Sequence, residues 1–293
     1  MAPNVDPRTK YPKPPYPYQT QDGQPGATEP MWPQPDHGEH TYRGTGRLRG
    51  LRALITGGDS GIGRAVAIAY AREGADVAIT YLPEEEADAR ELESALRDIE
   101  TRLLTIPVDL REEAGCIEAV ARTVGSLGGL DILVLNAGTQ SDRDSNAQIS
   151  RDEILNVFET NLVAPLILMR EAAPCLDPGS SVIVTASIQS YNPNPSLLDY
   201  AMTKAALVSF TEALAKEQGP RGVRVNAVAP GPIWTPLIPA TGWGDHVEDF
   251  GADTPLGRAG QPAELAGAYV FLASESASYV SGTVIGVTGG KHF

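Results

Sequence analysis

The chain has 293 residues, 42% hydrophobic and 20% charged, which is enough apolar material for one large folded domain with or without an appendage. It carries 37 Asp and Glu against 23 Lys and Arg, and a net charge of −14 argues against nucleic acid or anionic lipid as a partner. There is no apolar run long enough for a membrane span, no secretory leader profile, and only two cysteines without metal-ligand spacing, so we expect a cytoplasmic protein without a metal site.

Residues 1–47 form a proline-rich segment, with ten of the 24 prolines between Pro3 and Pro35. This density excludes a regular helix or a central strand. Two interpretations remain open: a disordered tail, or an extended arm that lies over the body or over a neighbouring subunit. In the second case the docking surface would come from aromatic side chains, namely Tyr11, Tyr16, Tyr18 and Trp32.

From Leu51 onwards, short apolar runs alternate with amphipathic stretches, which is typical of βαβ units and a parallel sheet. The predicted strands are residues 52–56, 76–80, 102–107, 132–135, 181–185, 224–228 and 284–287. The predicted helices are residues 63–73, 83–99, 112–124, 151–173, 198–217 and 262–273. We therefore expect an α/β protein: residues 48–293 form a single Rossmann-type doubly wound domain with a seven-stranded parallel sheet, preceded by the proline-rich arm.

A glycine-rich turn follows the first predicted strand directly, with Gly57, Gly61 and Gly63 in a GxxxGxG spacing rather than the commoner GxGxxG. Glycines permit close backbone approach, and the free amides at the start of the next helix favour a bound diphosphate. The turn, which also contains Asp59, Ser60 and Ile62, thus predicts a dinucleotide site. An ordinary strand-to-helix loop is the alternative.

Two further segments follow predicted strands. Asn136, Ala137 and Gly138 come after the fourth strand, where small residues let the backbone pass close to a cofactor. Asp109 and Leu110 come after the third, where a carboxylate would accept a hydrogen bond from an adenine amino group. Each segment alone is equally consistent with a capped turn.

Tyr200 and Lys204 stand at positions i and i+4 of a predicted helix, so they share one face. A neighbouring cation is expected to lower the pKa of the phenol, which would make Tyr200 a usable proton donor. Ser187 follows the fifth strand and would polarise a substrate carbonyl. Asn161 lies within an apolar helical pattern, where a buried hydrogen-bonding role is the alternative to a catalytic one.

Together these residues resemble the short-chain dehydrogenase/reductase family over about Leu51 to Gly290. The turn 56–63 is similar to the family's TGxxxGxG motif, residues 136–138 to its NAG motif, and the catalytic set would be Asn161, Ser187, Tyr200 and Lys204. Leu135 and Thr288 depart from the family pattern, which usually has Asn and Asp there. The proline-rich arm and the TGGDSGIGR sequence resemble a bacterial subgroup of general stress or glucose/ribitol-type dehydrogenases.

The resemblance implies hydride transfer between a nicotinamide and a carbonyl or alcohol carbon, with Tyr200 as general acid/base. It implies that Lys204 also binds the nicotinamide ribose, that Asn161 anchors a water, and that Asp109 touches the adenine. The segment with Pro230, Gly231, Ile233 and Thr235 would hold the nicotinamide carboxamide. It further implies a homotetramer. The alternative function is a dinucleotide-binding redox sensor or scaffold without turnover.

Cofactor choice rests on the end of the second strand, where Tyr81 replaces the carboxylate expected of an NAD enzyme. The acidic run 84–86 is interpreted as the first turn of a helix, and Ser60 stands where many NADP enzymes have a basic residue. The sequence favours NADP(H), with NAD(H) as the alternative. Residues 189–198 and 236–254 are expected to cover a small-molecule substrate, with an apolar wall (Trp234, Leu237, Ile238, Trp243) and polar groups (Asn192, Asn194, Asp245).

Overall fold

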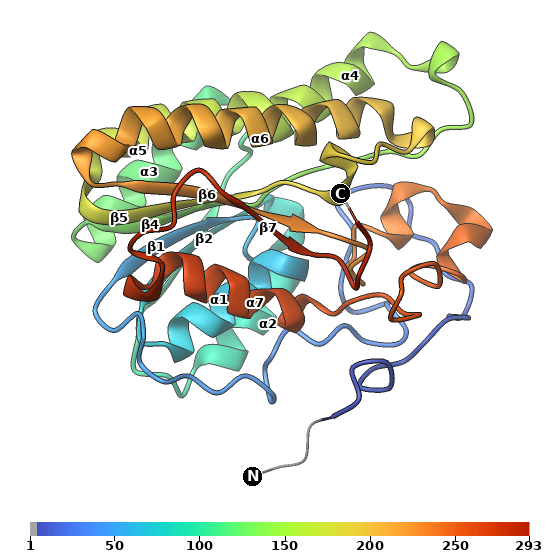
Figure 1. The fold of residues 1–293 in the computed structure, drawn as a ribbon, viewed down its shortest axis with the longest axis horizontal. Coiled ribbons are helices and arrows are strands. Elements are labelled where there is room, and N and C mark those ends of the chain that lie inside the picture. The colour runs from blue at the N-terminus through green and yellow to red at the C-terminus, as the bar shows by residue number, and fades with distance from the viewer. Residues whose placement is uncertain (1–4, 293) are drawn as a thin grey trace.

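The computed structural model describes residues 5–292, which form a twisted sheet of seven parallel strands in the order β3-β2-β1-β4-β5-β6-β7 (Figure 1). The strands are β1 (Arg52–Thr56), β2 (Asp76–Tyr81), β3 (Leu103–Pro107), β4 (Leu130–Leu135), β5 (Leu176–Thr185), β6 (Arg224–Pro230) and β7 (Val284–Val287). Central strands are buried on both faces, which explains their continuous apolar runs. The predicted fold class is confirmed.

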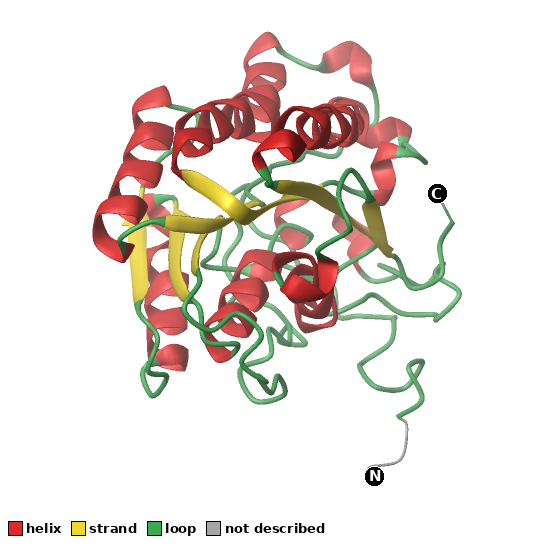
Figure 2. Ribbon diagram, turned by 60° about the vertical axis from the view of Figure 1, so that its left-hand side comes forward, coloured by secondary structure: helices red, strands yellow, loops and turns green. Residues whose placement is uncertain are grey.

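Helices cover both faces of the sheet (Figure 2). They are α1 (Gly61–Arg72), α2 (Glu86–Leu96), α3 (Glu113–Leu127), α4 (Arg151–Phe158), α5 (Ala164–Ala172), α6 (Leu198–Gln218) and α7 (Pro262–Ala273). The hydrophobic core under one face joins α1, α2 and α7, and the core under the other joins α3, α5 and α6. Helices α1, α2, α3 and α5 thus bury one apolar face against the sheet, whereas α4 buries only Val157.

The predicted helix 151–173 is wrong in one respect, because it is interrupted. A π-helical turn, Glu159–Val163, separates α4 from α5. Pro165 has no backbone N–H to donate to the carbonyl of Asn161, so the regular α-helical bond is lost there and the turn widens. Asn161 lies inside this wide turn.

The strand order reverses beside β1, which lies between β2 and β4. Connections from β1 and β4 therefore leave in opposite directions and open a crevice at the carboxyl ends of the strands. The glycine turn after β1 and the Asn136–Gly138 segment after β4 both lie at this crevice.

The described part of the proline-rich segment (residues 5–47) lies along the body (Figure 1). This favours the extended arm over the disordered tail. Tyr16 and Met31 are buried in a separate cluster with Trp234, and the rings of Tyr16 and Trp234 stack with centroids 4.4 Å apart. Two of the four aromatic side chains expected to dock the arm do not do so, because Tyr18 and Trp32 are 59% and 66% exposed. In the described part of the chain, no helix has the length and apolar character to span a membrane.

Candidate active site

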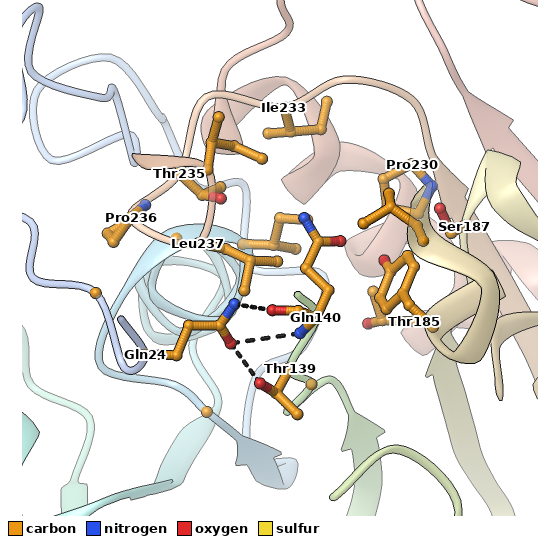
Figure 3. Close-up of a pocket in the computed structure, with 18 of the residues that line it drawn as sticks. Gln24, Thr139, Gln140, Thr185, Ser187, Pro230, Ile233, Thr235, Pro236 and Leu237 are labelled. Atoms are coloured by element: carbon orange, nitrogen blue, oxygen red, sulfur yellow. Dashed lines mark hydrogen bonds between the residues drawn. The ribbon is translucent and has the colours of Figure 1, made fainter. Parts of the chain in front are cut away.

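A cavity of about 960 Å³ runs along the carboxyl edge of the sheet. Most of the predicted site residues line it: Gly57, Asp59, Ser60, Gly61, Ile62, Tyr81, Asp109, Leu110, Asn136, Ala137, Gly138, Ser187, Tyr200, Lys204, Pro230, Gly231, Ile233 and Thr235. Gly63 and Asn161 lie behind its wall. Figure 3 shows part of the cavity, with Ser187 and Thr185 on one side and Thr235 and Pro236 on the opposite side.

The glycine turn is built for close backbone packing. Gly57 and Gly61 have positive φ angles of 59° and 49°. A Cβ on Gly63 would lie 1.8 Å from the carbonyl oxygen of Gly57, so no other residue fits there. The first backbone bond of α1 runs from the amide of Arg64 to the carbonyl of Ser60 at 2.9 Å, so the amides of residues 61–63 have no intrahelical acceptor and suit an anionic ligand.

Asn136 fastens this turn to β4. Its side-chain amide donates to the carbonyls of Thr56 and Gly57, both at 3.1 Å, and its own backbone N–H donates to Thr56 Oγ1 at 2.9 Å. Leu135, where the family usually has Asn, is 3% exposed and packs into the core. The apolar replacement therefore leaves the polar network around Asn136 intact.

Tyr200 and Lys204 project from one face of α6 into the cavity, and Ser187 approaches from the end of β5. Lys204 Nζ lies 5.5 Å from the centroid of the Tyr200 ring and donates to the carbonyl of Thr185 at 2.8 Å. Burial raises the pKa of Tyr200 to about 12, while the hydrogen bond with Ser187 acts in the opposite direction. Burial also lowers the pKa of Lys204 to about 8.

The expected lowering of the Tyr200 pKa is therefore wrong, because burial raises it. Desolvation dominates because the side chain of Tyr200 is almost fully buried, and the hydrogen bond with Ser187 lowers the pKa by less.

Asn161 lies directly behind the cavity wall and is fully buried. Its Oδ1 accepts from the backbone N–H of Thr139 at 2.9 Å, and its Nδ2 donates to the Thr139 carbonyl and to Thr203 Oγ1, both at 3.0 Å. The buried hydrogen-bonding role of Asn161 is therefore confirmed, and its catalytic role stays a prediction.

The opposite end of the cavity is acidic. Asp59 is 1% exposed, and its Oδ2 has no hydrogen-bond partner among the described residues. Burial, together with the nearby Glu85, raises the pKa of Asp59 well above its ordinary value. Burial also raises the pKa of Glu85 to about 7. Glu85 caps the turn after β2 by accepting from the amide of Leu82 at 3.0 Å, as interpreted from sequence, but it lines the cavity as well.

Two predicted adenine-side residues already have partners. Asp109 accepts from Arg111, and this hydrogen bond holds the pKa of Asp109 below its usual range. The Tyr81 hydroxyl donates to Glu86 at 2.5 Å, and burial together with this bond raises the pKa of Tyr81 to about 12.

The predicted apolar wall of the substrate site is confirmed in part. Leu237, Ile238 and Trp243 line the cavity, but Trp234 is fully buried under the arm and donates from Nε1 to the carbonyl of Pro33 at 2.8 Å. Asn194 lines the cavity and Asn192 is not among its lining residues.

Sequence reasoning missed the contribution of the arm, from which Gln24, Pro25 and Gly26 line the cavity. It also missed Arg143, whose Nη1 donates to both carboxylate oxygens of Asp199 at 3.1 Å. No local pattern marks these residues, because each reaches the site through a contact distant in sequence. Residues 5–292 contain no group of three His, Cys, Asp or Glu side chains that could hold a metal ion.

Comparisons with known proteins agree with this geometry. The family model described as enoyl-(acyl carrier protein) reductase matches residues 57–292. General stress protein 39 of Bacillus subtilis is 50% identical over 281 residues, covering 96% of this chain and 98% of that protein. The chloroplastic NADPH-dependent aldehyde reductase 1 of Arabidopsis thaliana is 43% identical, covering 93% and 96%.

Among solved structures, a short chain dehydrogenase from Burkholderia cenocepacia in complex with NADP superimposes with a TM-score of 0.77 at 33% identity, covering 83% of this chain and 98% of that one. The fold, the arrangement of the site and these relatives lead to one conclusion. The chain belongs to the short-chain dehydrogenase/reductase family and is an NAD(P)-dependent oxidoreductase.

Proposed function

We propose that this oxidoreductase interconverts a small carbonyl compound and its alcohol, using NADP(H). The observation that carries the proposal is the convergence of Ser187, Tyr200 and Lys204 on one end of a cavity whose other end is a glycine turn. A redox sensor needs the glycine turn but no proton donor, so this convergence favours turnover over the alternative of a binding scaffold.

The residues present fit a dinucleotide. The cofactor-binding set we propose is the predicted one: Gly57, Asp59, Ser60, Gly61, Ile62, Gly63, Tyr81, Asp109, Leu110, Asn136, Ala137, Gly138, Tyr200, Lys204, Pro230, Gly231, Ile233 and Thr235. The free amides after Ser60 suit a diphosphate. A Cβ at Gly63 would collide with the carbonyl oxygen of Gly57, so the turn keeps this close packing only with glycine there. When bound, the nicotinamide supplies or accepts the hydride.

Tyr200 moves the proton. In reduction its hydroxyl donates to the carbonyl oxygen while the Ser187 hydroxyl holds that oxygen, and in oxidation the transfers run in reverse. Lys204, held at the Thr185 carbonyl, is charged below its pKa of about 8 and stabilises the phenolate that forms at Tyr200. Asn161 orients the wall beside Lys204 and anchors a water, by resemblance to the family.

NADP(H) is the preferred cofactor in this proposal because Tyr81, not a carboxylate, ends β2, and because a relative is named as NADPH-dependent. Glu85 and Asp59 nearby are disposed to hold protons, which limits repulsion of a 2′-phosphate near neutral pH. NAD(H) remains the alternative, and side-by-side Kd measurements for NADPH and NADH decide between them.

We also propose a homotetramer that packs through α4, α5 and α6 and through β7. Support comes from large apolar side chains that these helices leave exposed, among them Leu166 at 58% and Met202 at 54%. Light scattering on a gel-filtration column measures the mass. The division into an arm (1–47) and a catalytic domain (48–293), and the cytoplasmic location, stay predictions.

The test of the proposed chemistry is a panel of aldehydes, ketones, polyols and sugars assayed at 340 nm with both cofactors, followed by Tyr200→Phe. Loss of the phenolic proton donor should lower kcat by about 10² or more while NADPH binding is kept. Full activity of Tyr200→Phe would overturn the assignment of Tyr200. A wild-type protein that turns over no member of the panel but binds NADPH would favour the scaffold.

A further inference from the structure

The proline-rich arm reaches the cavity at residues 24–26. There it lies between the turn that follows β4 and the segment that follows β6 (Figure 3). A Cβ on Gly26 would lie 2.4 Å from the carbonyl oxygen of Pro236 and 2.8 Å from Ala240 Cβ. The arm is therefore wedged against the 236–240 segment with no room for a larger side chain.

Gln24 uses both ends of its amide on the opposite wall. Its Oε1 accepts from the Thr139 hydroxyl and from the Gln140 backbone N–H at 3.4 Å, and its Nε2 donates to the Gln140 carbonyl. An amide presents a donor and an acceptor side by side, which matches the neighbouring groups of this turn. The hydrogen bonds join segments 115 residues apart in the sequence.

The same turn orients the deepest part of the site. Thr139 is held through its hydroxyl by Gln24, while its backbone N–H and carbonyl hold both ends of the Asn161 amide. Asn161 in turn donates to Thr203 Oγ1 at 3.0 Å, and Thr203 directly precedes Lys204 on α6. A shift of the turn therefore moves the hydrogen-bond partners of Asn161 and, through Thr203, the part of α6 that carries Lys204.

We propose that Gln24 is a positioning residue that the N-terminal arm supplies to the active site: it fixes the Thr139–Gln140 turn and, through it, Asn161 and Lys204. Gln24 acts on the wall of the site and not on the reacting atoms. The kinetic consequence of this inference rests on the proposed function.

The primary variant is Gln24→Ala, assayed with NADPH and the best carbonyl substrate of the panel. We expect kcat to fall about tenfold or more, because the variant loses all three hydrogen bonds of the Gln24 amide, with KM for NADPH within about twofold of wild type. The matched control is Gln19→Ala, since Gln19 also pairs with backbone N–H and carbonyl groups, but within the arm, at Trp32. The control should keep wild-type kcat, and an equal loss in both variants would overturn the proposal.

Gln24→Glu separates positioning from mere stabilisation of the arm. A protonated carboxyl reproduces the donor and acceptor of the amide, whereas a carboxylate would face the Gln140 carbonyl with no proton to donate. Activity relative to wild type should therefore rise as the pH falls toward the ordinary carboxyl pKa of about 4.3 and should decline as the pH rises. A pH-independent ratio would count against the inference.

Hydrogen exchange of the segment 137–143 provides a readout without turnover. Exchange should be faster in Gln24→Ala than in wild type and unchanged in Gln19→Ala. Faster exchange with an unaltered kcat refutes the positioning role, and unaltered exchange refutes the structural link. A fully active Tyr200→Phe would instead refute the proposed chemistry, and the exchange result would stand.

Discussion

Replacing Tyr16 by alanine tests whether the arm is docked in solution as it is in the structure. The ring is 3% exposed, stacks on Trp234, and belongs to a cluster with Met31 and Ile238. Truncating a buried aromatic residue to alanine costs about 3–5 kcal/mol. This cluster joins the arm to the segment after β6, so the loss falls on the docking of the arm.

For a chain of 293 residues, about 3 kcal/mol corresponds to a fall in Tm of roughly 5 °C. The variant should also move the Trp234 emission to the red, because that ring is fully buried under Tyr16. The emission is best measured with Trp32 and Trp243 replaced by Phe, which leaves Trp234 as the single tryptophan of the three.

Tyr16→Phe is the matched control. It keeps the stacked ring and loses the hydrogen bonds of the hydroxyl, to the Pro12 carbonyl at 3.3 Å and with the backbone of Ala259, so it should cost about 1 kcal/mol. If Tyr16→Ala has the same Tm as Tyr16→Phe and the Trp234 emission maximum does not move, the arm does not cover Trp234 in solution and the prediction is refuted.

Three further predictions concern the cavity. Lys204→Met should raise the free energy of unfolding at pH 7 by about 2 kcal/mol, because removing the cost of burying the charged ammonium outweighs losing its hydrogen bond to the Thr185 carbonyl. The same variant should abolish activity. Because the pKa of Lys204 is lowered from 10.5 to about 8, the wild type gains stability as the pH rises through that range, so the difference in urea midpoint should shrink by pH 10. Gly63→Ala should abolish NADPH binding, as measured by fluorescence titration, because its Cβ would meet the Gly57 carbonyl, whereas Gly125→Ala, with open space around it, should bind normally. Burial raises the pKa of Glu85 to about 7, so Glu85 gains its charge as the pH rises and the wild-type Kd for NADPH should increase between pH 6.5 and 8.5. The increase should be smaller for Glu85→Gln and for NADH, where only the loss of charge on Lys204 remains.

The sequence was sufficient for the sheet and for the residues at its carboxyl edge. Apolar runs that alternate with amphipathic helices specify a doubly wound fold, and the position of a residue just after a strand then places it at the crevice. Asn136 and Ser187 were located by this rule alone.

What sequence could not supply depends on contacts between distant segments. Gln24 meets Thr139 from a stretch without periodicity, so no local pattern predicts it. Trp234 was assigned to the substrate wall because it is apolar and close to Ile233, yet the arm covers it on the other side. The direction of the Tyr200 pKa shift also depends on burial, which only the folded structure provides.

The wide π-helical turn between α4 and α5 rotates the second helix about the common helix axis relative to the first. Successive residues of an α-helix are about 100° apart, so one additional residue in the turn rotates everything after it by that angle. In this way α4 packs against α6 and α5 against α3 from the same stretch of chain. A single-residue deletion within 159–163 would leave Pro165 in place but remove this rotation, and would move either Asn161 away from Thr139 or α5 away from α3.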